Sequence, residues 1–144
     1  MQAFPALSEL IAALHALPYE LNSKVSALQL SVPLPGATML SQLQTGAAVF
    51  RRLYGAIGDQ TTGFAVTAVY FIGTADWQSG QGGEVTLSSS DTAYQPVTIE
   101  PQADRLLLFD SRQVWFERAA VCSPEPQWAV VFCMHGSSLE KASQ

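Results

Sequence analysis

The chain has 144 residues, of which 48% are hydrophobic and only 13% are charged, and its formal net charge at pH 7 is −5. This length suits one domain with a buried core, and we expect a single domain over residues 1–144 with its core at about 24–136. The acidic balance and the lack of a basic cluster disfavour a nucleic-acid-binding surface.

The shortage of charged residues has two interpretations. An average soluble domain carries roughly 25% charged residues, about twice the fraction found here. A compact β-protein with a small polar surface would account for the shortage. So would a subunit that hides part of its surface against a partner, because interface cores are depleted in charge. Composition alone leaves both interpretations open.

Neither membrane insertion nor a disulfide scaffold is expected. No apolar run approaches the roughly 18 residues that span a bilayer, and the start "MQAFPALSEL" lacks the basic region of a secretory signal. The two cysteines are Cys122 and Cys133, and Cys133 lies in "AVVFCMHG", where we expect a buried free thiol. These features favour an intracellular, reducing compartment, either the cytoplasm or the interior of an organelle.

The first part of the chain mixes helical and extended patterns. Residues 5–17, "PALSELIAALHAL", place leucine and isoleucine at spacings of three and four, which predicts a helix that starts at Pro5 and is ended by Pro18. Residues 23–32, "SKVSALQLSV", alternate as a strand does. Residues 47–57, "AAVFRRLYGAI", are expected to form a short helix.

From residue 64 onward the pattern is that of β-strands. Short segments rich in β-branched and aromatic residues are separated by Gly, Pro, Ser and Asp, and they lie at 64–73, 83–89, 95–101, 104–111, 113–121 and 127–135. Strands at this spacing predict a sandwich or barrel such as a jelly roll. With the N-terminal helix covering one face of a sheet, the fold class is α+β, mainly β.

The second half of the chain resembles a known family. The blocks "TAVYFIGTADWQSGQGGEVTL", "VTIEPQADRLLLFDS" and "QWAVVFCMHG" are similar, in this order, to core segments of the iron- and 2-oxoglutarate-dependent dioxygenases, most closely of the prolyl-hydroxylase branch. The resemblance covers roughly residues 64–136 and implies the double-stranded β-helix of that family, which is a jelly roll. It does not by itself imply activity, because function depends on the site.

The metal ligands of that family are missing from the matching positions. The family holds iron with a His-x-Asp pair and a distal His. The resemblance places Gln42 and Gln44, in the turn "PGATMLSQLQ", at the first pair, and Phe116 at the distal His. The two histidines, His15 and His135, are followed by Ala-Leu and Gly-Ser, so neither begins such a pair. We therefore expect no metal, no cofactor and no oxygenase activity.

Three residues are candidates for the remains of a co-substrate site. The family pairs an Arg of the last strand with the far carboxylate of 2-oxoglutarate, and the resemblance places Gln127 there. Arg118 shares a strand face with Phe116, where it either reaches the pocket mouth to bind an acidic ligand or pairs with a carboxylate across the sheet. Tyr70 is the third candidate. Trp115 faces the other way and is a candidate partner contact.

The segment "GQGG", residues 80–83, is not expected to bind phosphate. A strand follows it, whereas a phosphate-binding loop leads into a helix. We expect its glycines to serve a turn and a close approach of strands.

These patterns favour a catalytically inactive relative of the dioxygenases whose fold serves a structural role. Phe116 and its apolar neighbours would fill the space vacated by iron. The expected function is a structural or scaffolding subunit of a larger assembly, with other protein subunits as its partners. A binding module for a small acid or a proline-containing peptide is one alternative, and an enzyme with a displaced metal site is another.

Overall fold

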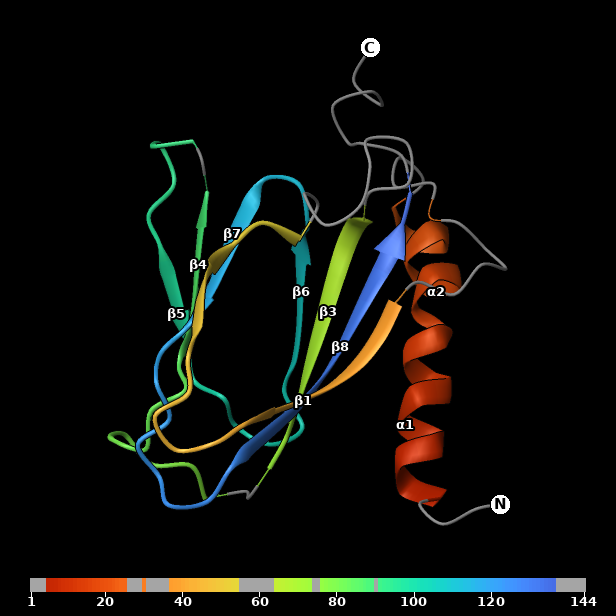
Figure 1. The fold of residues 1–144 in the computed structure, drawn as a ribbon. Helices are drawn as coiled ribbons and strands as arrows, with labels where there is room; N and C mark the ends of the chain where they lie inside the picture. The colour runs from red at the N-terminus through yellow and green to blue at the C-terminus, as the bar shows by residue number, and fades with distance from the viewer. Residues whose placement is uncertain are drawn as a thin grey trace.

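The computed structural model describes residues 5–25, 30, 37–54, 64–73, 76–89 and 91–136. Within these residues two helices precede eight strands (Figure 1). The helices are α1 (Pro5–His15) and α2 (Leu17–Lys24). The strands are β1 (Ala37–Leu43), β2 (Val49–Arg52), β3 (Phe64–Ile72), β4 (Val85–Ser89), β5 (Val97–Ile99), β6 (Leu106–Asp110), β7 (Val114–Arg118) and β8 (Gln127–His135).

The strands form two four-stranded antiparallel sheets that face each other (Figure 1). The first sheet has the order β1-β8-β3-β6 and the second the order β2-β7-β4-β5. Apart from β4 and β5, consecutive strands alternate between the sheets, and the first strand pairs with the last, with Leu43 opposite Gln127. This arrangement is a double-stranded β-helix, so the predicted jelly roll is confirmed.

The helices cover the outer face of the first sheet, as predicted (Figure 1). Leu14 of α1 is 3% exposed and packs in one cluster with Ala68 of β3 and Phe132 of β8. Strands β3 and β8 are therefore covered on one face by helix and on the other by the second sheet, which explains their nearly continuous apolar runs. Neither helix is long and apolar enough to cross a membrane.

A second cluster fills the space between the sheets. It contains the inward residues of both, namely Tyr54, Val69, Phe71, Val85, Phe109, Phe116, Ala129, Val131 and Cys133. Cys133 is a fully buried free thiol, as predicted, whereas Cys122 is exposed. Burial raises the pKa of Cys133 to about 11, which keeps the thiol protonated and unreactive.

Two predicted boundaries in the first part of the chain are wrong. Helix α1 ends at His15, and Pro18 lies in the first turn of α2 instead of ending the helix. A proline is tolerated there because the first turn has no intrahelical partner for its missing N–H. Residues 37–43, within the segment expected to be a turn, form β1.

The helix predicted at residues 47–57 is also wrong. Residues 49–52 of this segment form β2, which pairs with β7. Residues 55–57 lie outside the described residues. In the strand predicted at 23–32, Ser23 and Lys24 belong to α2 and Leu30 forms a bridge with Gly136. Residues 26–29 and 31–32 lie outside the described part.

Candidate functional site

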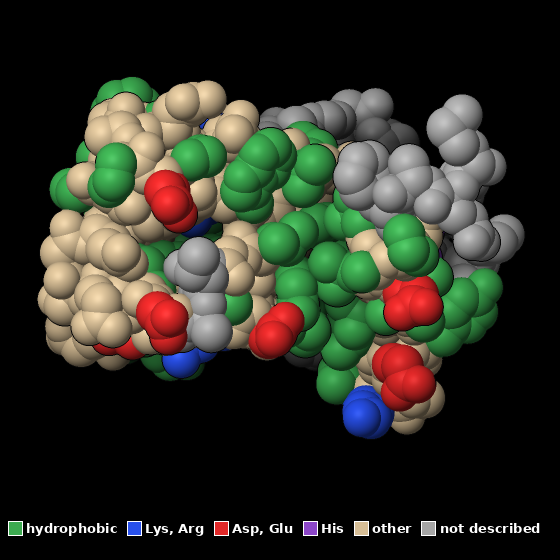
Figure 2. All heavy atoms as spheres, turned by 90° about the horizontal axis from the view of Figure 1, so that it is seen from below, with side chains coloured by type: hydrophobic (Ala, Val, Ile, Leu, Met, Phe, Trp, Pro, Cys, Tyr) green, Lys and Arg blue, Asp and Glu red, His purple; other side chains and the backbone are tan. Residues whose placement is uncertain are grey.

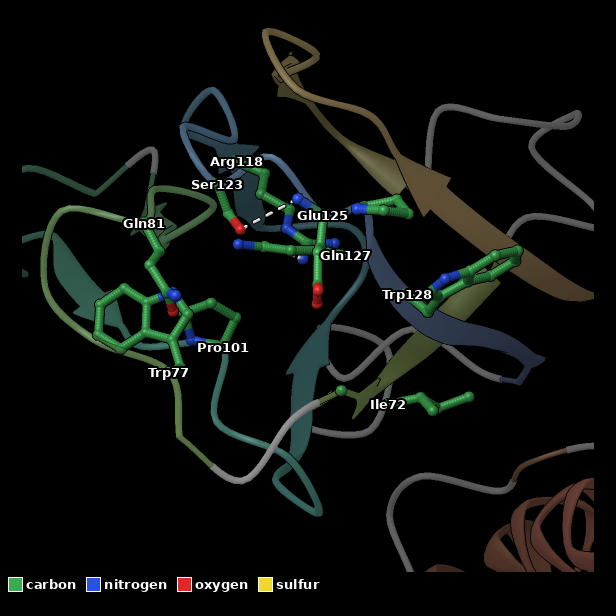
Figure 3. Close-up of a pocket in the computed structure, with 11 residues that line it drawn as sticks. Ile72, Trp77, Gln81, Pro101, Arg118, Ser123, Glu125, Gln127 and Trp128 are labelled. Atoms are coloured by element: carbon green, nitrogen blue, oxygen red, sulfur yellow. Dashed lines mark hydrogen bonds between the residues drawn. The ribbon is translucent and has the colours of Figure 1, made fainter.

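A cavity of about 420 Å³ opens where β7 ends and β8 begins, at the end of the sandwich drawn lowest in Figure 1. Figure 3 shows the side chains that converge on it. Strands β7 and β8 supply Arg118 and Gln127, and the loop before β4 supplies Trp77. Two of the three candidates for the remains of a co-substrate site, Arg118 and Gln127, therefore line the same cavity.

Arg118 is a buried cation in the wall of this cavity. It is the last residue of β7, is only 4% exposed, and shares the inward face with Phe116, as predicted. Its Nε donates to the carbonyl of Gly83 at 3.1 Å, and its Nη2 donates to Oε1 of Gln127 at 2.8 Å. Both acceptors are neutral, and no carboxylate of the described residues bonds to Arg118, so the alternative of an ion pair across the sheet is not found in that part of the chain.

Burial has an electrostatic consequence for Arg118. Loss of hydration lowers the pKa of its guanidinium well below its ordinary value, to about 10, and this exceeds the opposing effect of nearby Tyr54. The guanidinium lies 5.5 Å from the ring centroid of Phe71, a cation–π contact that offsets part of the cost. At neutral pH the side chain is charged.

Gln127 is held from two sides. Its Oε1 accepts from Arg118, while its Nε2 donates to the carbonyl of Gly82 at 3.0 Å. Trp77 Nε1 donates to the same carbonyl at 3.0 Å. The amide that replaces the expected arginine of the last strand is therefore part of a fixed hydrogen-bonded clamp.

The glycines of "GQGG" make this clamp possible. Gly82 and Gly83 have φ angles of 77° and 83°, which side chains rarely adopt. A Cβ on Gly82 would lie 2.1 Å from the carbonyl oxygen of Ala120, and one on Gly83 would lie 2.0 Å from Oε1 of Gln127. The predicted close approach is confirmed. The sequence carried this signal but did not reveal which residues the glycines approach.

Phe116 belongs to an aromatic cluster in the interior. It is 3% exposed and stacks on Phe109 with ring centroids 5.8 Å apart. Tyr54 meets its ring edge-on at 5.5 Å. Burial raises the pKa of Tyr54 and keeps its hydroxyl neutral, although Arg52 acts in the opposite direction. The cluster offers aromatic rings where the resemblance implies a metal ligand.

The other two positions matched to metal ligands do not join Phe116. Gln42 is exposed on β1 of the first sheet, opposite Trp128, and Gln44 is exposed just after that strand. Phe116 is buried on β7 of the second sheet. Two exposed amides and a buried phenyl ring do not fit the donor set of ferrous iron.

Both histidines are engaged outside the cavity. His15 lies on α1, 5.1 Å from the ring of Phe132, with Nε2 3.0 Å from Oγ1 of Thr38. His135 lies at the far end of β8 from Gln127 and packs on Phe64 at 4.8 Å. The described residues contain no group of three or more His, Cys, Asp or Glu side chains that could hold a metal ion.

Tyr70 does not join Arg118 and Gln127. It lies on the outer face of β3, beside an apolar groove of about 880 Å³ between α1 and the first sheet. Its hydroxyl donates to the carboxylate of Asp104, which raises the pKa of Tyr70. Trp115, the candidate partner contact, is half-buried with the guanidinium of Arg51 4.8 Å from its ring centroid.

Solved prolyl hydroxylases have the same fold. A prolyl 4-hydroxylase of Pseudomonas putida superposes with a TM-score of 0.75 at 21% identity, over 94% of this chain and 69% of that chain. A prolyl hydroxylase from Trichoplax adhaerens, solved with a hypoxia-inducible-factor peptide fragment, gives 0.74 at 21% identity, over 95% and 58%. A prolyl 4-hydroxylase of Phytophthora capsici gives 0.72 at 23% identity, over 90% and 43%.

These likenesses confirm the predicted resemblance at the level of the fold. No model of a protein family and no curated protein matches the sequence. The chain spans less than half the length of the Phytophthora protein. It therefore has a prolyl-4-hydroxylase-like fold, and what this fold does must be argued from its residues.

Proposed function

We propose that this chain is a non-catalytic, prolyl-hydroxylase-like domain that serves as a structural subunit of a larger protein assembly. The observation that carries the proposal is the packing of Phe116 against Phe109 and Tyr54. Closely packed rings make this part of the interior an ordinary apolar core. A metal centre would need polar donors and an open coordination position in the same space.

The places of the two histidines support the absence of iron chemistry. A facial triad takes two imidazoles and one carboxylate. Here the imidazole of His15 lies at the end of α1 beside Phe132, and that of His135 lies at the far end of β8 beside Phe64. Bringing both to the cavity beside Arg118 would require the fold to be rearranged.

The surface supports a role in an assembly. The outer face of the first sheet carries large apolar residues that are more than a third exposed, namely Leu40, Leu106, Leu108 and Trp128. Figure 2 shows hydrophobic side chains gathered on the side where α1 lies against the sheet. Apolar surface of this kind is typical of protein–protein contacts. A subunit that covers it would also account for the low content of charged residues.

The lack of catalysis is tested by metal binding and turnover. We expect the purified chain, incubated anaerobically with ferrous iron, to bind far less than one equivalent and to form no succinate from 2-oxoglutarate and oxygen. One equivalent of bound iron together with succinate formation would overturn this half of the proposal.

The role as a subunit is tested in the native source. We expect the tagged chain to co-purify with other proteins in a fixed stoichiometry. Leu40→Glu, at a position 53% exposed on β1, should release it from them. Phe50→Glu is the matched control, because Phe50 is 87% exposed but lies on the second sheet. A chain that migrates as a monomer, with no partner in fixed ratio, would contradict the proposal.

A further inference from the structure

The cavity beside Arg118 contains a buried positive charge that bonds to no carboxylate of the described residues. Arg118 is 4% exposed, and its hydrogen bonds go to the carbonyl of Gly83 and the amide of Gln127. Among the described residues no carboxylate bonds to it. Burying a guanidinium without an anion is unfavourable, in agreement with its lowered pKa of about 10. An anion in the cavity would offset this cost.

The guanidinium is held in one orientation and keeps donors to spare. Nε and Nη2 are bonded, whereas Nη1 has no hydrogen-bond partner in the described part of the chain. Gln127 is itself fixed by the carbonyl of Gly82, so it cannot swing away from the guanidinium without losing that bond. A planar cation that is already immobilised binds a carboxylate at little further entropic cost.

The remaining walls define the kind of anion. Trp77, Pro101, Ile72 and Trp128 give the cavity an apolar side that suits a hydrocarbon body, next to a polar side that includes Gln81, Ser123 and Gln127. Glu125 is the exposed carboxylate of the lining. Its negative charge repels a second negative charge on a ligand. The cavity therefore favours an acid with one carboxylate and an apolar remainder over a dicarboxylate.

We infer that this cavity binds a small monocarboxylic acid, with its carboxylate on the guanidinium of Arg118 and its apolar body between Trp77, Pro101 and Trp128. Its volume of about 420 Å³ is in the usual range of small-molecule sites. The site uses Arg118 of β7 and needs no metal. It is independent of the proposed role as a subunit, since a subunit can carry such a ligand or lack one.

The ligand class is tested by calorimetric titration of the purified chain. The probes are benzoate, phenylacetate, 3-phenylpropionate and 3-methylbutanoate, each with its primary amide, and 2-oxoglutarate as the dicarboxylate. We expect at least one acid to saturate one site and to bind at least tenfold more tightly than its amide and than 2-oxoglutarate. Absence of saturable binding by every acid, or equal binding of acids and amides, would overturn the inference.

Variants separate the roles of the two charges. Arg118→Gln should reduce affinity for the best acid at least tenfold, and Arg105→Gln is the matched control because Arg105 is exposed outside the cavity and bonds to the carbonyl of Glu100. Since Arg118→Gln could unfold the chain, Glu125→Gln at an exposed position provides a second test. It should raise affinity for 2-oxoglutarate severalfold relative to the monocarboxylate. An unchanged ratio would overturn the assigned selectivity.

Discussion

Phe116 and Arg118 lie two residues apart on β7, and both point into the interior. The alternation of a strand is enough to predict that they share a face. It is not enough to predict their partners, because Phe109, Tyr54, Gly83 and Gln127 come from four other segments. Of the three residues that the sequence suggested for this site, Arg118 and Gln127 line the cavity and Tyr70 does not. The neutral partners of the arginine required the fold.

Truncating Phe116 should remove a large part of the stability. Phe116→Ala deletes a ring that is packed against Phe109 and Tyr54 and leaves a cavity, so we expect a loss of about 3–5 kcal/mol in the free energy of unfolding. Phe50→Ala is the control on a neighbouring strand, because Phe50 is 87% exposed and should cost less than about 0.5 kcal/mol. Urea unfolding measures both changes. Similar losses for the two variants would contradict the interior packing.

The buried charge of Arg118 should make stability depend on pH in the alkaline range. Burial lowers the pKa of Arg118 to about 10 in the folded chain, whereas in the unfolded chain the pKa keeps its higher, ordinary value, so between the two values the unfolded state holds the extra proton. Stability then increases as pH rises through about 10, by up to about 1.4 kcal/mol per pH unit.

The measurement compares the unfolding free energy of the wild type and of Arg118→Met between pH 8 and pH 11. The difference between the two chains cancels the titration of the other groups. We expect the wild type to gain stability relative to the variant over this range. Two parallel profiles would show that the guanidinium is hydrated in the folded state.

At the scale of elements, the sequence predicted β3 to β8 and missed β1 and β2, each of which lies at the edge of its sheet. Strands β3 and β8 have strong apolar runs because both of their faces are covered. Strand β2 has the sequence "VFRR", in which only Val49 packs inward, and it is a strand because it pairs with β7 far along the chain. The sequence of residues 49–52 alone cannot reveal a pairing with a strand so far along the chain. Tertiary contacts decide the secondary structure of such a segment, because its intrinsic preference is weak.

The loop before β4 offers a test of close backbone approach. Gly82→Ala would place a Cβ 2.1 Å from the backbone oxygen of Ala120, and Gly80→Ala would place one where nothing lies within 4 Å. Both glycines have positive φ, so both variants pay the strain of that conformation, about 1–2 kcal/mol. We expect Gly82→Ala to lower the free energy of unfolding by at least about 2 kcal/mol more than Gly80→Ala does, because the backbone oxygen of Ala120 cannot rotate out of the clash as a side chain could. Equal melting temperatures for the two variants would be the contrary result.

At the scale of the whole molecule, the fold depends on pairing between distant strands. Strand β8 lies between β1 and β3, so the last described strand joins the first one to the rest of the sheet. The apolar run of β8 fits a strand that is covered on both faces, but its neighbours β1 and β3 follow only from the observed pairing. Such non-local pairing predicts folding on the slow time scale of all-β domains, from milliseconds to seconds.

The same topology predicts an uneven resistance to local opening. Residues 129–133 of β8 are buried and paired on both sides, whereas β5 has only three residues, at a sheet edge, and is largely exposed. In native-state hydrogen exchange we expect the amides of β8 to exchange only through global unfolding, and those of β5 at least about 100-fold faster through local opening. Destabilising the chain with Phe116→Ala should then speed exchange in β8 far more than in β5. Equal protection of the two strands would mean that the sandwich opens only as one unit.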